Sequence, residues 1–294
     1  MDVAVTRIEL PQPVRAAASD GSTVWCAAGD GVRVYTTAGR PLEGGGTAPE
    51  LRSLAAVPGT VTATGAVPGT LAETVLVPRA FMGTPAPAPL PDGTLAGAGH
   101  GRVHWLGPSG APIAGARFDG RVVAGGGAIW AVGDGVARRL AAPRLLGEPL
   151  ELPGLDTCAV EGDRLWWTSE HDDVLRGGPK EVGLGRRERG AMTVCAGSLW
   201  ISVNGGLLRV SAWSGEPGRL VRAPEGPVPF LVCANGVLAG GGRDLFAFAP
   251  AAGTPLRVIR LGLDAPPALV IAAGRHVWVF PEGLPGALIV TPSP

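Results

Sequence analysis

The residues Ser169–Asp173, in the run SEHDDVLR, include side chains with which proteins bind cations and move protons. Carboxylates together with an imidazole can hold a divalent cation, and a histidine beside a carboxylate can act as a general base. Glu170 and His171 are therefore the catalytic candidates, and Asp172 and Asp173 join them as metal candidates. A solvated acidic loop is the first interpretation, a loop that contacts another protein the second, and a catalytic or metal site the third.

Further polar residues lie in turns at equivalent points of the chain. These residues are Asp30, His100, Asp134, Asn204, Arg243, Asp244 and Glu282. If these turns emerge on one face, they form a polar rim that could receive a ligand or a partner. Asp30-Gly31, Asp134-Gly135 and Asn204-Gly205 have a second explanation, which we prefer, because such pairs are what a tight hairpin uses with or without a ligand.

The turns belong to a segment that recurs about every 36 residues, as in GSTVWCAAGDGVRVY, GAIWAVGDGVARR and GSLWISVNGGLLRV. The copies align on one residue in each unit, and the aligned residues are Trp25, Thr62, Ala96, Trp130, Trp166, Trp200, Ala239 and Trp278. Repeats of this length, each a set of short strands, are typical of radial or stacked architectures.

Each unit is a series of short apolar runs separated by turns that contain Gly, Asp or Asn, which is the pattern of β-strands. The second run carries the tryptophan, as in RLWWTS and SLWIS. Asp-Gly and Asn-Gly favour the positive φ angles of two-residue hairpins. No window shows a sustained 3.6-residue apolar period with a cap, so we expect almost no helix.

Four-stranded antiparallel units of about this length are the blades of a β-propeller. The pattern G-x-[LI]-W-x-x…G-x-[LV]-x-R-[VL] in GSLWISVNGGLLRV resembles the broad superfamily of WD-repeat, quinoprotein-like and streptogramin-lyase-like propellers. We therefore expect one all-β domain over residues 1–294, with eight blades first, seven blades second and a linear stack third. Val3–Leu10 resembles the fourth strand Leu256–Leu261 and is expected to complete the last blade.

The phrase LWWTSEHDDVLR is also similar to a blade motif of streptogramin lyases, W-F-T-E followed by a strand that bears an arginine. The resemblance implies a catalytic histidine and a metal-binding glutamate on this face. Glu170 takes the position of that glutamate. No second histidine is located by a motif, and His100 is only a candidate on the same face.

Composition restricts the classes of partner. The chain has 46% hydrophobic residues, enough for a core, and its net charge of zero offers no field for nucleic acid or an acidic membrane. The N-terminus has no unbroken apolar core and is not a signal peptide, and no stretch approaches about 18 apolar residues. The basic run Lys180–Arg189 is interpreted as a solvated face. We expect a cytoplasmic protein with no nucleic-acid or membrane partner.

The four cysteines are Cys26, Cys158, Cys195 and Cys233. The last three occupy equivalent positions in their repeats, which we expect to lie a repeat-width apart and too far for a disulfide. All four are therefore expected to be small buried thiols in a reducing compartment.

The sequence contains no nucleophile elbow, phosphate-binding loop or H-E-x-x-H motif. The first functional hypothesis is thus a non-enzymatic scaffold or accessory subunit that binds another protein and needs no cofactor. Trp213, in the predicted loop SAWSGEPG, is a candidate contact residue if it is exposed. The alternative is a metal-assisted lyase or lactone hydrolase that uses a divalent cation on the channel face.

Overall fold

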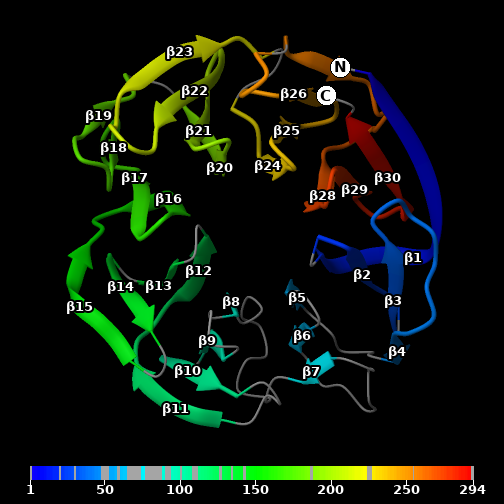
Figure 1. The fold of residues 1–294 in the computed structure, drawn as a ribbon, viewed down its shortest axis with the longest axis horizontal. Helices are drawn as coiled ribbons and strands as arrows, with labels where there is room; N and C mark the ends of the chain where they lie inside the picture. Colours follow the sequence, from blue (N-terminus) through cyan, green and yellow to red (C-terminus); the bar gives the residue numbers. More distant parts are fainter. Residues whose placement is uncertain are drawn as a thin grey trace. The chain divides into compact units, whose positions relative to one another are not determined.

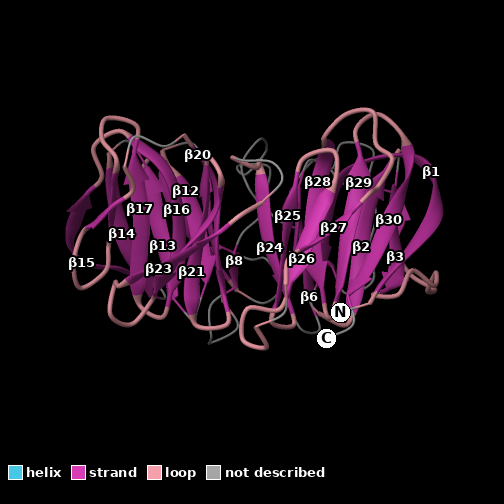
Figure 2. Ribbon diagram, turned by 90° about the horizontal axis from the view of Figure 1, so that it is seen from above, coloured by secondary structure: helices cyan, strands magenta, loops and turns pink. Residues whose placement is uncertain are grey.

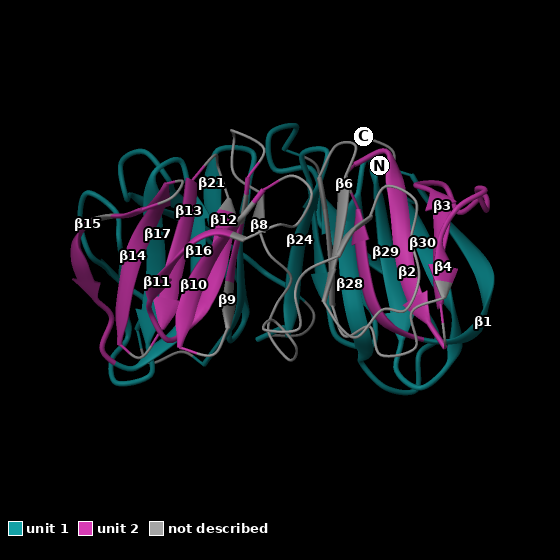
Figure 3. Cartoon of the chain, turned by 90° about the horizontal axis from the view of Figure 1, so that it is seen from below, with its two compact units in different colours: residues 1–13, 154–294 teal, residues 14–153 magenta. Residues whose placement is uncertain are grey.

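The computed structural model describes residues 2–19, 21–29, 31–47, 53–57, 60–64, 74–76, 88–89, 94–99, 101–107, 112–125, 128–133, 135–141, 144–185, 188–223, 227–253 and 255–292. All regular secondary structure in these ranges is β-strand, as expected (Figure 2). These ranges contain no helix that is long and apolar enough to cross a membrane. The chain forms two compact units, Met1–Pro13 with Gly154–Pro294 and Val14–Pro153 (Figure 3).

Within the described residues, the first unit contains three four-stranded sheets of consecutive strands, and β28–β30, which belong with β1–β4 to one seven-stranded sheet (Figure 1). Their strands are β16 (Leu155–Glu161), β17 (Arg164–Ser169), β18 (Val174–Arg176) and β19 (Val182–Gly183); β20 (Arg189–Cys195), β21 (Ser198–Val203), β22 (Gly206–Ser211) and β23 (Pro217–Val221); β24 (Phe230–Ala234), β25 (Val237–Gly241), β26 (Leu245–Phe248) and β27 (Arg257–Ile259); and β28 (Pro267–Ala273), β29 (His276–Pro281) and β30 (Pro285–Pro292).

The second unit has the same local plan. Its strands are β2 (Thr23–Ala28), β3 (Gly31–Thr36) and β4 (Gly46–Thr47); β5 (Ser53–Val57), β6 (Thr60–Thr64) and β7 (Thr74–Leu76); β8 (Ala88–Pro89), β9 (Leu95–Gly99), β10 (Arg102–Leu106) and β11 (Pro112–Arg117); and β12 (Arg121–Gly125), β13 (Ala128–Gly133), β14 (Val136–Ala141) and β15 (Arg144–Glu151). The pairing is antiparallel except between β6 and β7, which pair in parallel, so this unit departs from the expected blade pattern.

The strand β1 (Val3–Ser19) joins the expected N-terminal strand and the first strand of the first repeat into one continuous element. Its beginning pairs antiparallel with β30, from Val3 opposite Pro292 to Ile8 opposite Ala287. Its end pairs with β2, from Val14 opposite Ala28 to Ser19 opposite Val24. The expected pairing of Val3–Leu10 with the last repeat is therefore present, and it adds a fourth strand to the β28–β30 sheet.

The tryptophans of the second strands form the core, because each lies on the strand flanked on both sides within its sheet. Trp25, Trp166, Trp200 and Trp278 are buried, whereas Trp130 is half-buried. Trp166 packs with Leu199 and Ile201 of the next sheet. Its ring also lies over Gly178, where an added Cβ would clash. The expectation that these side chains pack between neighbouring sheets is met at Trp166.

The cysteine prediction is wrong for one pair, because Cys195 and Cys233 form a disulfide with a Cα–Cα distance of 5.4 Å. Cys195 is the last residue of β20 and Cys233 the last but one of β24, and these first strands of neighbouring sheets lie against each other. First strands thus approach more closely than one repeat-width. Cys26 and Cys158 form no disulfide within the described residues, and burial raises the pKa of the Cys26 thiol to about 12. The argument for a reducing compartment no longer holds for the bonded pair.

Candidate functional site

The acidic loop, as we call Ser169–Arg176, includes the last residue of β17, the turn that follows it, and β18. Thr168 and Ser169 are buried at the end of β17, while Glu170 and His171 are exposed. Asp172 and Asp173 are half-buried. The local fold therefore separates the four polar candidates into two exposed residues, Glu170 and His171, and two half-buried residues, Asp172 and Asp173.

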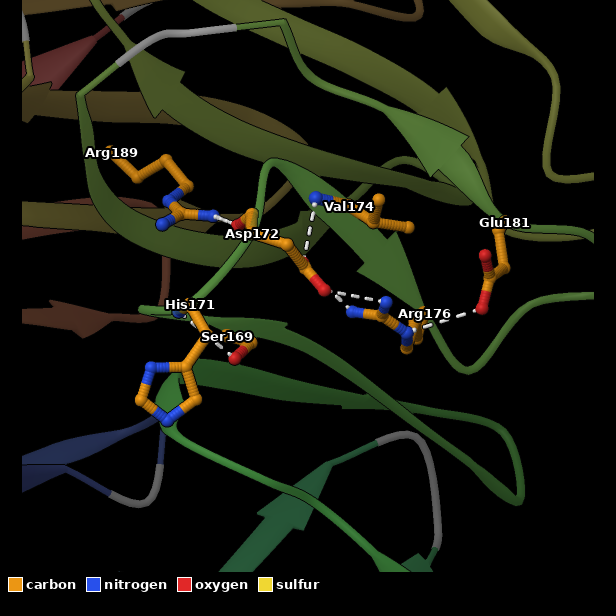
Figure 4. Close-up of polar contacts among 7 residues, drawn as sticks. All are labelled: Ser169, His171, Asp172, Val174, Arg176, Glu181 and Arg189. Atoms are coloured by element: carbon orange, nitrogen blue, oxygen red, sulfur yellow. Dashed lines mark hydrogen bonds and ion pairs between the residues drawn. The ribbon is translucent and has the colours of Figure 1, made fainter.

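Arg176 binds the Asp172 carboxylate with both ends of its guanidinium. Its Nη1 and Nη2 donate to Oδ1 and Oδ2 at 2.9 and 2.7 Å (Figure 4). The backbone N–H of Val174 donates to the same carboxylate at 3.1 Å, a side-chain bond typical of aspartate in turns. The hydrogen bonds from Arg176 hold the pKa of Asp172 below its usual value of 3.8. The ionised carboxylate is thus engaged within its own loop.

Arg176 is itself fixed by its surroundings. Its Nε donates to Glu181 at 3.1 Å, and its guanidinium lies 5.1 Å from the ring centroid of Trp167, a cation–π distance. The bond to Asp172 is the main cause of a raised pKa for Arg176. The side chain therefore stays charged and connects three parts of the same sheet.

Arg189, the first residue of β20, connects the acidic loop to the next sheet. It donates to the backbone oxygen of Asp172 at 2.6 Å and forms an ion pair with Asp156 at 3.4 Å. The hydroxyl of Thr168 donates to the same Asp156 carboxylate at 3.3 Å. The interpretation of Lys180–Arg189 as only a solvated face therefore misses a residue that links two sheets. Lys180, at the other end of that run, pairs with Glu216.

His171 does not face the Asp172 carboxylate. Figure 4 shows the two side chains directed to different sides of the loop. The imidazole lies over Gly154, where an added Cβ would clash with the ring, and the His171 N–H donates to Ser169 Oγ at 3.2 Å. The Glu170 N–H donates to the Gly154 oxygen at 2.7 Å. Within the described ranges, no three His, Cys, Asp or Glu residues gather as metal ligands would.

The other predicted rim residues divide into those with visible roles and those outside the described ranges. Asn204 is exposed in the β21–β22 turn, before Gly205 with φ of 87°, as its hairpin explanation predicts. The carboxylate of Asp244 accepts a hydrogen bond from the Leu261 N–H at 3.2 Å. Arg243 and Glu282 are exposed. Asp30, His100 and Asp134 lie outside the described residues.

Trp213 lies on a separate loop, Ser211–Glu216, between β22 and β23, which we call the Trp213 loop. Its side chain is 85% exposed. Within the loop, the Ser211 N–H donates to the Glu216 oxygen and the Gly215 N–H to the Ser211 oxygen, both at 2.9 Å. The hydroxyls of Ser211 and Ser214 accept two further backbone bonds, each at 3.2 Å.

Residues of the neighbouring β16–β19 sheet also hold the Trp213 loop. Arg164 on β17 donates to the backbone oxygens of Ala212 and Trp213, at 3.3 and 3.4 Å. Lys180 forms an ion pair with Glu216, and its side chain packs near Gly215. All these contacts use the backbone of the loop or Glu216. They fix the loop and leave the indole of Trp213 in solvent.

No family model matches the chain, and no curated protein matches its sequence. Solved structures do resemble it. A catalytically inactive virginiamycin B lyase from Staphylococcus aureus, solved with quinupristin, is 13% identical with a TM-score of 0.62, over 99% of this chain and 100% of that chain. The WD40 β-propeller domain of Doa1 is 15% identical with a TM-score of 0.56, over 99% and 96% of the two chains.

Hsv2 from Kluyveromyces lactis is 9% identical with a TM-score of 0.57, over 92% of this chain and 91% of that chain. These likenesses concern the fold, because sites and not architectures determine function. They include a lyase as well as a WD40 domain, so they favour neither of the two functional hypotheses. The chain therefore has an all-β fold that is similar to the folds of these β-propeller proteins.

Proposed function

We propose that this chain is a non-enzymatic scaffold or accessory subunit that binds another protein through Trp213. The exposed indole on a fixed loop is the observation that carries the proposal. Tryptophan is enriched among the residues that dominate binding energy at protein interfaces. The partner would offer an apolar pocket for the indole and acceptors for its N–H.

The rigidity of the Trp213 loop supports this role. Binding costs free energy when a loop must become ordered, and a loop that is already ordered avoids this cost. Here four internal hydrogen bonds and the contacts of Arg164 and Lys180 order the loop before any partner arrives.

The organisation of the acidic loop also favours a scaffold over the lyase or hydrolase. Asp172 is ion-paired with Arg176, and the ring of His171 lies over Gly154, away from that carboxylate. A general base must reach its substrate together with the group that orients it. In the described residues, Arg176 binds the Asp172 carboxylate, so this carboxylate does not orient His171 as the partner of a general base would.

We also propose that the chain is one β-propeller of eight blades, in which Val3–Leu10 completes the last blade. The pairing of β1 with β30 supports the second part of this proposal. The repeat spacing, with eight aligned positions from Trp25 to Trp278, supports the first. Such a domain would present the Trp213 loop on a rigid body.

The test is affinity capture with purified wild-type protein and two matched variants. Trp213→Ala removes the exposed indole, and Leu284→Ala removes another exposed apolar side chain, which is 52% exposed in the β29–β30 turn. We expect a partner that is retained stoichiometrically by wild type and Leu284→Ala, with at least about 30-fold weaker binding to Trp213→Ala, as for an interface hot spot. Equal binding by all three proteins, or no stoichiometric partner, would overturn the proposal.

A further inference from the structure

A pocket of about 300 Å³ lies between the β20–β23 sheet and the β26–β27 connection of the next sheet. It is distinct from the acidic loop and from the Trp213 loop. Its lining residues are Trp200, Arg209, Arg219, Val221, Phe248 and Leu256, together with Pro250, Gly253 and Pro255. The Cys195–Cys233 disulfide connects the same two sheets at their first strands, so a covalent bond limits their separation.

Two aromatic rings make the apolar part of this pocket. Trp200 and Phe248 are 2% and 4% exposed and meet edge to face, with ring centroids 5.3 Å apart. The indole N–H of Trp200 donates to the Cys195 oxygen at 3.2 Å, which fixes the orientation of the ring. Val221 and Leu256 extend the apolar lining. Most of the lining residues are apolar, so the pocket suits an apolar group.

Two arginines make the polar part. Arg209 on β22 stands directly opposite Trp200 on β21, so the two side chains share one face of the sheet. Arg219 and Val221 alternate on β23, with Val221 opposite Leu207, and both line the pocket. The Nε of Arg209 donates to Ser198 Oγ at 2.9 Å, which leaves its terminal nitrogens for another acceptor.

The charge of this pocket is not balanced by its lining. None of the lining residues that the structure describes carries a carboxylate. Among the residues that the structure describes, the Arg219 guanidinium has no hydrogen-bond or ion-pair partner. Arginine presents its donors in a planar fork that matches a carboxylate, and bonds between charged partners are about twice as strong as neutral ones.

We propose that this pocket binds a small aromatic carboxylate. The ring would lie against Trp200 and Phe248, and the carboxylate would accept hydrogen bonds from Arg209 and Arg219. The volume suits one small molecule, since it is at the lower end of the range for ligand sites, roughly 300–1,000 Å³. This proposal does not depend on a protein partner at Trp213, because the two features share no residue.

The test is isothermal titration calorimetry of the full chain with naphthoate as the probe and naphthamide as its neutral counterpart. We expect saturable one-to-one binding of naphthoate and at least about tenfold weaker binding of naphthamide, because loss of one charge-assisted interaction costs about that factor. Arg219→Gln and Arg209→Gln should each weaken naphthoate binding by at least about tenfold. Arg243→Gln, at an exposed arginine outside the pocket, is the matched control and should bind as wild type does.

The melting temperature of each variant shows that it is folded. Arg219→Gln is the decisive variant, since Arg219 is exposed and its loss removes no hydrogen bond or ion pair within the described residues. The proposal is overturned if wild type shows no saturable binding of naphthoate, if naphthamide binds as tightly, or if both arginine variants bind like wild type. Loss of binding in Arg219→Gln with an unchanged melting temperature supports it, whatever the result of the partner capture.

Discussion

The acidic loop and the Trp213 loop use their residues in opposite ways. In the acidic loop, two side chains that could take part in catalysis or metal binding contact other residues of the loop and its sheet. Asp172 pairs with Arg176, and the ring of His171 lies over Gly154. In the Trp213 loop, the backbone, two serine hydroxyls and Glu216 make the contacts, and the side chain of Trp213 stays in solvent. Reactive residue types alone therefore do not identify a site. A better indicator is a side chain that the fold holds in place and leaves exposed to solvent.

The largest expected effect on the free energy of unfolding comes from replacing a buried tryptophan by alanine, with the same substitution at the exposed Trp213 as the comparison. Trp166→Ala, on the strand that leads into the acidic loop, removes a fully buried side chain and should lower the free energy of unfolding by about 3–5 kcal/mol. Trp213→Ala removes an exposed side chain and should change it by less than about 0.5 kcal/mol. Urea unfolding monitored by circular dichroism measures both. A loss at Trp213 as large as that at Trp166 would show that its indole is structural and would remove the contrast between the loops.

Arg189→Gln has the next largest effect, because Arg189 connects the acidic loop and Asp156 to β20. Its side chain is 11% exposed, whereas that of Asp156 is 39% exposed, so the pair is only partly shielded from solvent. We expect a loss of about 1–3 kcal/mol in the free energy of unfolding. Arg243→Gln is the control, and its stability should stay within about 0.5 kcal/mol of wild type. If the two variants are equally stable, the link between the sheets is not structural, and the acidic loop is freer than the contacts indicate.

The strand pattern could be predicted because it depends on local sequence. The alternation of apolar runs and Gly-containing turns indicated strands without helix, and the aligned tryptophans at Trp25, Trp166, Trp200 and Trp278 are buried. Pairing of Val3–Leu10 with the last repeat followed from its likeness to Leu256–Leu261. These features need only the periodicity of side chains along one strand.

Contacts between sheets could not be predicted in the same way. The Cys195–Cys233 bond depends on how closely the first strands of two sheets approach, which the repeat length does not state. The role of Arg189 depends on Asp156 and Asp172, residues of the preceding sheet. The sequence of a charged run such as Lys180–Arg189 does not show which of its side chains points toward the protein. Likewise, the sequence suggested Trp213 as a contact residue but could not tell an exposed indole from a covered one.

The smallest and most specific effect concerns Asp172. Hydrogen bonds from Arg176 lower its pKa in the folded protein, so the ionised carboxylate contributes stability at pH above the unfolded value of about 3.8. That contribution is lost as pH falls through the lower folded pKa. Asp172→Asn should therefore melt below wild type at neutral pH, and the difference should shrink as the pH falls below about 3.8. Melting temperatures of both proteins across this range measure it, with Glu170→Gln as the exposed neighbour that should follow wild type at neutral pH.

The same variant decides whether the acidic loop is closed to ligands. If Asp172→Asn is as stable as wild type at neutral pH, Arg176 does not depend on this carboxylate, which is then free to bind a cation with Glu170 and Asp173. Titration of the wild-type protein with Mn²⁺ would then raise its melting temperature, because a ligand that binds only the folded state stabilises it. We expect no such rise, since a cation would have to displace a guanidinium that binds both oxygens of Asp172.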